Sequence, residues 1–144
     1  VVAGTCAEYD SSSGICSESR SVFKPSTLYG ACKRGFYQIV EAFSKQTGMS
    51  FAWGYVFHLF GYHENPNRFV PILIRGLLQN QEVPCSHGRQ IRDFLDVRDA
   101  ASAFVSLIES DVQGGVNIGS GNGVSLKEMG RLIESLIGSP DLLR

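Results

Sequence analysis

Short apolar runs alternate along this chain with longer segments of helical periodicity, and this alternation constrains the fold more than any other feature. The first run, Val1 to Gly4, is apolar throughout, as expected of a strand buried on both faces of a parallel sheet. A helix is predicted from Ser26 or Thr27 to Gly48, because glycine suits the position that ends a helix. Downstream, the sequence predicts a strand over 50–57, a short helix over 69–77 and a hairpin-like segment over 83–97. A further helix is predicted to begin at Asp96 or its neighbour, and a strand is predicted over 116–118. The last predicted helix begins with a capping box at Ser125 and Glu128. Strands and helices alternating at these lengths predict an α/β fold with a parallel sheet.

The predicted helix over 26–48 carries two stripes of side chains. Tyr29, Lys33 and Tyr37 form one stripe, because residues four apart share a helix face. The neighbouring apolar stripe is expected to face the core, and it consists of Leu28, Cys32, Phe36, Ile39, Val40 and Phe43. We therefore expect Tyr29 and Lys33 to lie beside the core and to face a cleft.

Composition argues against several classes of function. The chain has 144 residues, a formal net charge of −1 and 43% hydrophobic residues, which is ordinary for one globular domain. It has no basic cluster that would predict nucleic-acid binding, and no apolar run that would predict a membrane span or a signal peptide. None of its four cysteines has a second cysteine at C-x-x-C spacing or a histidine at ligand spacing. We expect free thiols in a cytoplasmic protein, and no metal site.

Tyr29 and Lys33 carry the clearest chemical pattern. Tyrosine is a weak base at neutral pH unless its phenolate is stabilised, and a lysine ammonium one helical turn away stabilises it by charge attraction. A hydroxyl brought from a strand end, such as that of Thr5, would hold the substrate oxygen while the proton moves. Because removing a proton from an alcohol is useful mainly if a hydride leaves the same carbon, the pattern implies a nicotinamide cofactor, NAD or NADP. The spacing alone is weak, since it recurs on many surface helices.

A glycine-rich segment, Gly119 to Gly123, lies between a predicted strand and a predicted helix. A dinucleotide-binding fingerprint needs its third glycine three residues after the second, and Val124 stands at that place. We therefore predict a tight turn that leads into the capping box, and not a phosphate-binding loop.

Five collinear parts of the chain strengthen the pattern around Tyr29. They are T-C-A-E-Y at 5–9 with P-S-T-L-Y-G-A-C-K at 25–33, the strand and turn at 54–61, R-F-V-P at 68–71, G-R-Q-I-R-D-F-L-D-V-R-D at 88–99, and V-N-I-G-S-G at 116–121 with V-S-L at 124–126. Together they resemble the C-terminal half of the extended short-chain dehydrogenases, the NAD-dependent epimerase/dehydratase family that acts on nucleotide sugars. The resemblance implies the C-terminal portion of a Rossmann-like parallel sheet, with the glycine-rich turn of the N-terminal half outside this chain. It further implies a catalytic strand and helix over 1–57, and over 58–144 mostly a small substrate-binding lobe that returns to the core.

The resemblance also implies roles for individual residues. Tyr29 would be the general base and acid at the sugar hydroxyl, Lys33 would assist it and bind the nicotinamide ribose, and Thr5 would hydrogen-bond the reacting oxygen. Arg92 would clamp the nucleotide diphosphate, with Arg68 as a second candidate for the same task. His58 stands where many relatives have a substrate-contacting asparagine, and it is either a substrate ligand or a strand histidine bonded to backbone.

Departures from the family pattern narrow the expected activity. Family dehydratases use acidic residues just after the threonine, where this chain has Cys6 and Ala7. The resemblance therefore favours an NAD(P)-dependent nucleotide-sugar epimerase or 4-ketoreductase that forms a homodimer as a complete protein. The alternatives are a non-catalytic sensor that binds a dinucleotide or nucleotide sugar, as changes at Tyr55, Phe60 and Tyr62 suggest, and an inactive half-domain. We expect the isolated chain to bind dinucleotide poorly and to be inactive.

Overall fold

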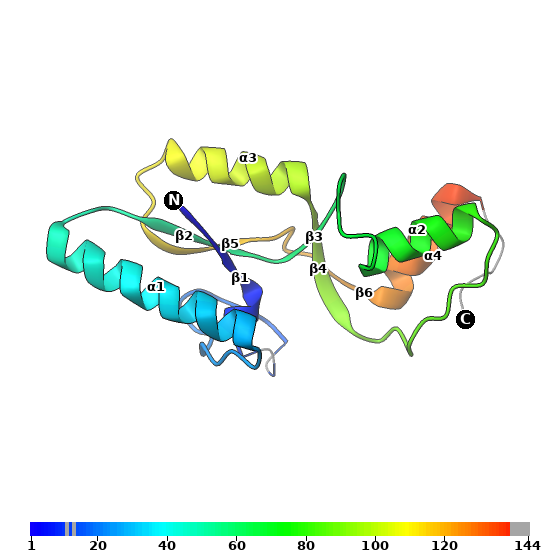
Figure 1. Ribbon diagram of the computed structural model, residues 1–144, viewed down its shortest axis with the longest axis horizontal. Helices are drawn as coiled ribbons and strands as arrows, with labels where there is room; N and C mark the ends of the chain where they lie inside the picture. The colour runs from blue at the N-terminus through cyan, green and yellow to red at the C-terminus, as the bar shows by residue number, and fades with distance from the viewer. Residues whose placement is uncertain (11, 13, 139–144) are drawn as a thin grey trace.

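A three-stranded parallel sheet forms the centre of one lobe. It contains β1 (Val2–Thr5), β2 (Ala52–Val56) and β5 (Gly114–Ile118), in the order β1-β2-β5. Thr5 lies opposite Val56, and Val56 lies opposite Ile118, so the carboxyl ends of the strands meet at one edge. Helices α1 (Leu28–Thr47) and α3 (Val97–Ile108) lie on opposite sides of this sheet (Figure 1). The arrangement confirms the predicted α/β fold and is Rossmann-like.

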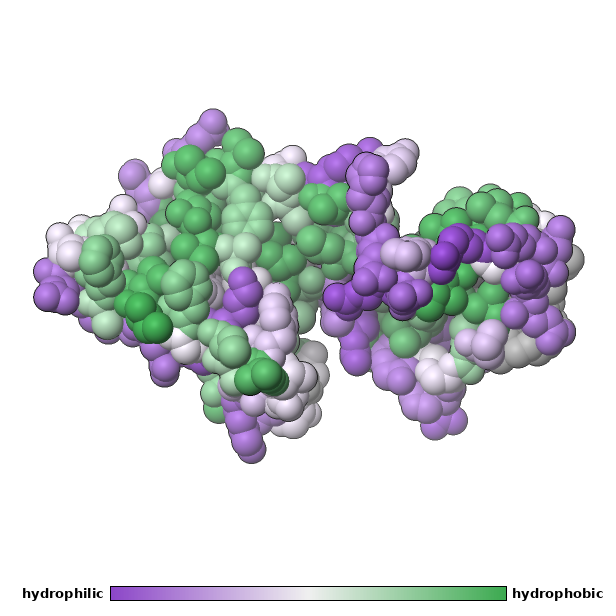
Figure 2. Space-filling view, viewed as in Figure 1, coloured by the Kyte–Doolittle hydropathy of each residue, from purple (hydrophilic) through white to green (hydrophobic). Residues whose placement is uncertain are grey.

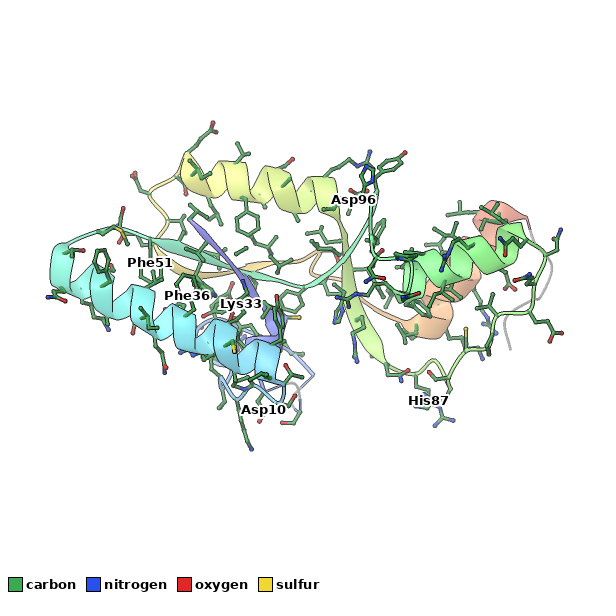
Figure 3. The ribbon with its side chains drawn as sticks, viewed as in Figure 1. Asp10, Lys33, Phe36, Phe51, His87 and Asp96 are labelled. Carbon is green, nitrogen blue, oxygen red and sulfur yellow. The ribbon has the colours of Figure 1, made fainter. Side chains whose placement is uncertain are left out.

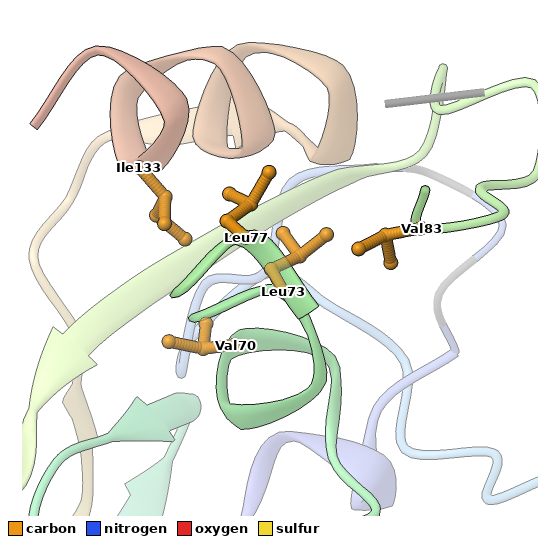
Figure 4. Close-up of a cluster of buried hydrophobic side chains, with 5 residues drawn as sticks. All are labelled: Val70, Leu73, Leu77, Val83 and Ile133. Carbon is orange, nitrogen blue, oxygen red and sulfur yellow. The ribbon is translucent and has the colours of Figure 1, made fainter. Parts of the chain in front are cut away.

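A second sheet continues from the carboxyl end of the first. Strand β4 (Ile91–Asp96) lies between β3 (His58–Phe60), to which it is parallel, and β6 (Gly123–Ser125), to which it is antiparallel. Helices α2 (Phe69–Leu78) and α4 (Leu126–Ile137) pack together at the far end of the molecule, beyond this sheet (Figure 1). Their shared core contains Val70, Leu73, Leu77, Val83 and Ile133 (Figure 4).

The computed structural model describes residues 1–10, 12 and 14–138. It contradicts two of the predicted strand assignments. The predicted strand over 50–57 is divided at Phe57 between β2 and β3, which belong to different sheets. The predicted hairpin over 83–97 is absent, because residues 84–90 are irregular and β4 pairs instead with β3 and β6. Pro84 lacks the backbone N–H that a ladder needs, and Gly88 has a φ of 65°, so this segment is unsuited to a strand.

Helix α1 turns a different face to the sheet from the one predicted. Leu28 and Ile39 are 82% and 67% exposed, and Cys32, Phe36 and Phe43 are exposed too. Of the predicted apolar stripe, Val40 packs on the buried ring cluster of Tyr9, Trp53 and Tyr55, and Phe36 touches Trp53 with one ring edge. Figure 2 shows hydrophobic residues gathered over α1 and α3.

Helix boundaries follow the predicted caps. Thr27 caps α1 through a hydrogen bond from the Gly30 N–H (3.1 Å), and Gly48 ends that helix with a φ of 75°. Asp96 caps α3, and Ser125 with Glu128 forms the predicted capping box of α4. Within the part of the chain that the structure describes, no helix has both the length and the apolar character needed to cross a bilayer.

Candidate active site

Thr5 lies at the carboxyl end of β1 and is almost completely buried. It begins a short 3-10 helix, η1 (Cys6–Glu8), by accepting a hydrogen bond from the Ala7 N–H at its Oγ1 (3.3 Å). The Glu8 side chain completes the capping box by accepting a hydrogen bond from the Thr5 N–H at its Oε1 (3.0 Å). These bonds fix both the backbone and the hydroxyl of Thr5 where the parallel strands end.

Glu8 is completely buried behind Thr5. Its Oε1 also accepts a hydrogen bond from the Trp53 indole (3.1 Å), whereas its buried Oε2 has no hydrogen-bond partner among the described residues. Burial raises the pKa of the Glu8 carboxyl, and the bonds from Thr5 and Trp53 oppose that change. The carboxyl group supports Thr5 from inside the core.

Tyr29 and Lys33 lie near the start of α1, which packs on η1 and β1. The close approach depends on Gly30, where an added Cβ would lie 2.3 Å from the Ala7 carbonyl oxygen. Lys33 reaches toward the sheet and donates from Nζ to the carbonyl oxygen of Ala3 in β1 (2.9 Å; Figure 3). Tyr29 is 57% exposed beside it. The structure thus brings Lys33 to β1 and packs the start of α1, which carries Tyr29, against η1 directly after Thr5.

His58, Arg68 and Arg92 form a second group. His58 begins β3 opposite Phe94 of β4, and Arg92 precedes Phe94 by two residues on the same face of the sheet. Arg68 stands at the start of α2, and the following Phe69 ring stacks near that of Phe94 (6.4 Å between centroids). Burial lowers the pKa of His58, and the charges of Arg92 and Arg68 lower it further.

The positive charge of Arg92 acts at the carboxyl end of β1. Burial and the nearby Cys16 thiol raise the pKa of Cys6 to about 11, while Arg92 acts in the opposite direction. Since Cys6 directly follows Thr5, the positive charge of Arg92 reaches the strand end that holds the Thr5 hydroxyl. Cys6 is a neutral thiol, so this position has no carboxylic acid.

Asp93 determines the shape of the glycine-rich turn. Its Oδ1 accepts hydrogen bonds from the Ser120 N–H and hydroxyl (both 2.7 Å), and its Oδ2 accepts the Gly121 N–H (2.9 Å). An added Cβ on Gly119 would lie 2.7 Å from the same carboxylate. Because Asp93 already occupies these backbone donors, the turn cannot cradle the phosphates of a dinucleotide. Among the described residues, this turn is therefore not a phosphate-binding loop for a dinucleotide.

A set of hydrogen bonds that the sequence did not predict holds the loop after η1 against the sheet. The Tyr9 hydroxyl donates to Asn117 Oδ1 (2.8 Å), and Asn117 Nδ2 donates to the Cys16 carbonyl oxygen (3.1 Å). The Asn117 N–H in turn donates to the Glu18 carboxylate (2.7 Å). No local sequence pattern predicts contacts between residues about a hundred positions apart, so these hydrogen bonds are visible only in the structure.

Arg34 and Tyr55 form a second arrangement that the sequence did not predict. The Arg34 guanidinium donates to the Tyr55 hydroxyl (3.3 Å) and stacks between the rings of Phe23 (3.9 Å) and Tyr37 (4.5 Å). Tyr55, one of the departures from the family pattern, is therefore a buried packing residue with its hydroxyl partnered.

An apolar cavity of about 360 Å³ lies between α2, residues 83–88 and the start of α4. Phe69, Leu73, Val83 and Leu126 contribute to its walls, and Phe69 directly follows Arg68 in the chain. Among the described residues, no group of three or more histidine, cysteine, aspartate or glutamate side chains is placed to hold a metal ion.

Comparison with solved structures identifies the class of fold. The chain superposes on UDP-N-acetylglucosamine 4-epimerase from Methanobrevibacter ruminantium M1 with a TM-score of 0.92 at 23% identity, over 99% of this chain and 48% of that one. It superposes on dTDP-glucose 4,6-dehydratase from Bacillus anthracis str. Ames, solved in complex with NAD, with a TM-score of 0.87 at 22% identity, over 99% of this chain and 48% of that one. At these identities the likeness shows the fold, which is that of Rossmann-like α/β proteins.

The sequence comparisons identify the family. The model of the NAD dependent epimerase/dehydratase family matches residues 1–119, so the chain belongs to that family. CDP-abequose synthase of Salmonella typhimurium is 32% identical over 105 residues, which are 69% of this chain and 35% of that protein. The chain thus spans about a third of this curated relative and about half of each solved structure.

Proposed function

We propose that the complete protein is an NAD(P)-dependent nucleotide-sugar epimerase or 4-ketoreductase, and that this chain supplies its C-terminal half. One set of observations supports the proposal: the start of α1, with Tyr29 and Lys33, packs on β1 and η1 near Thr5, and the charge of Arg92 acts on Cys6, which directly follows Thr5. A proton-transfer site beside an anion site is what oxidation or reduction of a phosphorylated sugar requires.

The chain's own residues would hold the sugar and move its proton. Tyr29 would take the proton from the reacting sugar hydroxyl or return it, and the Thr5 hydroxyl would hydrogen-bond the same oxygen. The Lys33 ammonium would stabilise the tyrosinate and would exchange its bond to the Ala3 carbonyl for ribose hydroxyls. A bound nicotinamide supplies the hydride acceptor and donor that protein side chains lack.

The second group would hold the rest of the substrate. Arg68 and Arg92 would bind the diphosphate, because a planar guanidinium matches phosphate oxygens in pairs. His58 would contact the same diphosphate or the sugar. The apolar cavity, of about 360 Å³, would accept the nucleobase.

Epimerase or ketoreductase chemistry suits η1 better than elimination of water from the sugar. Elimination uses acidic groups after the threonine, and this chain places Cys6 and Ala7 there. Glu8 is the nearest carboxyl on η1, and it is committed to Thr5 and Trp53 inside the core. We therefore do not expect 4,6-dehydratase activity.

The same proposal covers the organisation of the complete protein. Residues 1–57 would form the catalytic strand and helix, and residues 58–144 mostly the substrate-binding lobe, with β5 returning to the central sheet. The exposed apolar face of α1, with Leu28, Ile39 and Phe43, would be covered in a homodimer.

The Tyr29→Phe variant of the complete protein tests the mechanism. With a panel of UDP-, dTDP- and CDP-sugars, we expect Tyr29→Phe to lower kcat by about a hundredfold or more while binding is retained, since it removes one proton-transfer group. Tyr62→Phe is the control for loss of an exposed tyrosine hydroxyl, because Tyr62 is exposed and belongs to neither of the two residue groups. Undiminished turnover by Tyr29→Phe would refute the mechanism.

The same panel separates the second candidate, a relative that binds nucleotide sugars without converting them. The exposed Tyr29 and the bond between Lys33 and Ala3 are the observations that favour it. Tight binding of a nucleotide sugar with no turnover, unaffected by Tyr29→Phe, would establish this candidate in place of the enzyme.

A further inference from the structure

His58 is held in place by its strand while its imidazole keeps its hydrogen-bonding capacity. Its backbone pairs with Phe94 in β4, and its ring lies 6.0 Å from the Phe94 ring, between centroids. The side chain is half-buried. Neither ring nitrogen forms a hydrogen bond with any part of the chain that the structure describes, so both can serve a ligand.

Positive charge predominates around this imidazole. From β4, Arg92 acts on His58, and its guanidinium donates to the Ile91 carbonyl oxygen (2.7 Å). From the start of α2, Arg68 acts on it too. Neither arginine forms an ion pair with a described residue. Two unneutralised guanidinium groups therefore oppose a proton on His58.

Negative groups nearby do little to offset them. Asp93 acts on His58 from β4, but its carboxylate is engaged by Ser120 and Gly121. In the loop before α2, Glu64 is influenced by Arg68, and burial raises the pKa of its carboxyl. At the start of α3, Asp96 is paired with Arg98 (2.7 Å). Burial and the two arginines consequently lower the pKa of the free imidazole and favour its neutral form.

A diphosphate bound between the arginines would reverse these conditions. Its two negative charges would neutralise the guanidinium groups and would attract a proton to the adjacent imidazole, which would then donate hydrogen bonds from both nitrogens. We propose that His58 takes up a proton from solvent when a nucleotide diphosphate binds beside Arg68 and Arg92, so that substrate binding strengthens as the pH falls. This proposal rests on the proposed function, since it assumes a nucleotide-sugar ligand.

The direction of the pH effect follows from linkage. In the free protein the pKa of His58 lies below its ordinary value, and in the complex it is raised by the diphosphate. Affinity therefore increases as the pH falls through the pKa of the complex. It becomes constant below the pKa of the free protein, where His58 is protonated in both states. The diphosphate diester of a nucleotide sugar does not itself titrate in this range, so the effect belongs to the protein.

Calorimetry on the complete protein measures the proton directly. UDP-glucose, dTDP-glucose and CDP-glucose are titrated at pH 7 in phosphate and in Tris buffers, whose ionisation enthalpies differ, and the difference in observed heat gives the protons taken up. We expect the wild-type protein to take up a substantial fraction of a proton per site. His58→Asn should bind the same sugar with no uptake from this position, because asparagine keeps a hydrogen-bonding group that does not titrate.

His63→Asn is the matched control. His63 is exposed in the turn after β3 and has a φ of 63°, a conformation that asparagine tolerates. It should take up protons as the wild type does. Binding by the wild type without proton uptake, or equal uptake by His58→Asn, would overturn the role of His58 and leave the proposed function standing. Failure of every nucleotide sugar to bind would overturn both.

Discussion

The carboxyl group of Glu8 connects the position of Thr5 to the stability of the fold. Oε1 holds the Thr5 N–H and the Trp53 indole from inside the core. The Trp53 indole fills the space beside Gly4, where an added Cβ would lie 1.9 Å from the indole Nε1. A buried neighbour that holds the Thr5 backbone would keep the hydroxyl proposed to act on substrate in a fixed geometry.

Replacing Glu8 should change the pH dependence of stability. Burial raises the pKa of Glu8 in the folded state, so its charged form costs stability as the pH rises through that value. Glu8→Gln keeps the acceptor oxygen and cannot ionise. In denaturant unfolding at about pH 5 and about pH 8, we expect its stability relative to wild type to improve at the higher pH. A relative stability that falls with pH would contradict this account.

Glu8→Ala is the companion variant. It leaves the buried Thr5 N–H and Trp53 Nε1–H without an acceptor, and each unpaired donor costs about 1–3 kcal/mol. We expect the free energy of unfolding to fall at both pH values. No loss of stability would mean that these bonds contribute little.

Local sequence signals predicted several single residues well. The S/T-x-x-E spacing of Ser125 and Glu128 gave the cap of α4, and the same spacing of Thr5 and Glu8 would have revealed the second capping box. Contacts such as that of Asn117 with Glu18 depend on chain topology, and no local pattern encodes them. The roles of Thr5, Tyr29, Lys33, His58, Arg68 and Arg92 remain predictions.

Helix α1 shows why periodicity predicted its length but not its orientation. The side of the helix that meets the protein is chosen by Gly30, which permits contact with η1, and by Arg34 and Tyr37, which pack on buried rings. An aromatic and cationic face can therefore lie inward, while the more apolar stripe with Leu28 and Ile39 faces outward. Periodicity alone cannot distinguish a face that meets the same chain from one that meets another surface.

Two glycines of α1 test the importance of its contact with η1. In Gly30→Ala the new methyl group would collide with the Ala7 carbonyl oxygen, so we expect a loss of about 1–3 kcal/mol in unfolding free energy and reduced turnover as Tyr29 shifts. Gly35→Ala is the matched control, since nothing lies within 4 Å of its Cβ position. It should stabilise the helix by about 0.5–1 kcal/mol. Equal effects of the two substitutions would show that the contact is unimportant.

At the scale of the whole molecule, the chain combines two sheets, for which we propose different tasks. The parallel sheet carries Thr5 at its carboxyl end and is contacted by Lys33 from α1, and the mixed sheet carries His58 and Arg92. The alternation of strands and helices predicted the first sheet. The split at Phe57 and the pairing of β4 with β6 were not predicted, because pairing between distant strands is decided by tertiary packing.

Dinucleotide binding tests the central claim, that this chain holds the catalytic and substrate-binding residues while the phosphates of NAD(P) bind elsewhere in the complete protein. NAD and NADP are titrated by calorimetry into the complete protein and into the isolated chain of 144 residues. Far-ultraviolet circular dichroism shows whether the isolated chain keeps its helices. We expect the isolated, folded chain to bind at least about a hundredfold more weakly, a difference of about 2.8 kcal/mol. Equal affinity of the two proteins would contradict the claim.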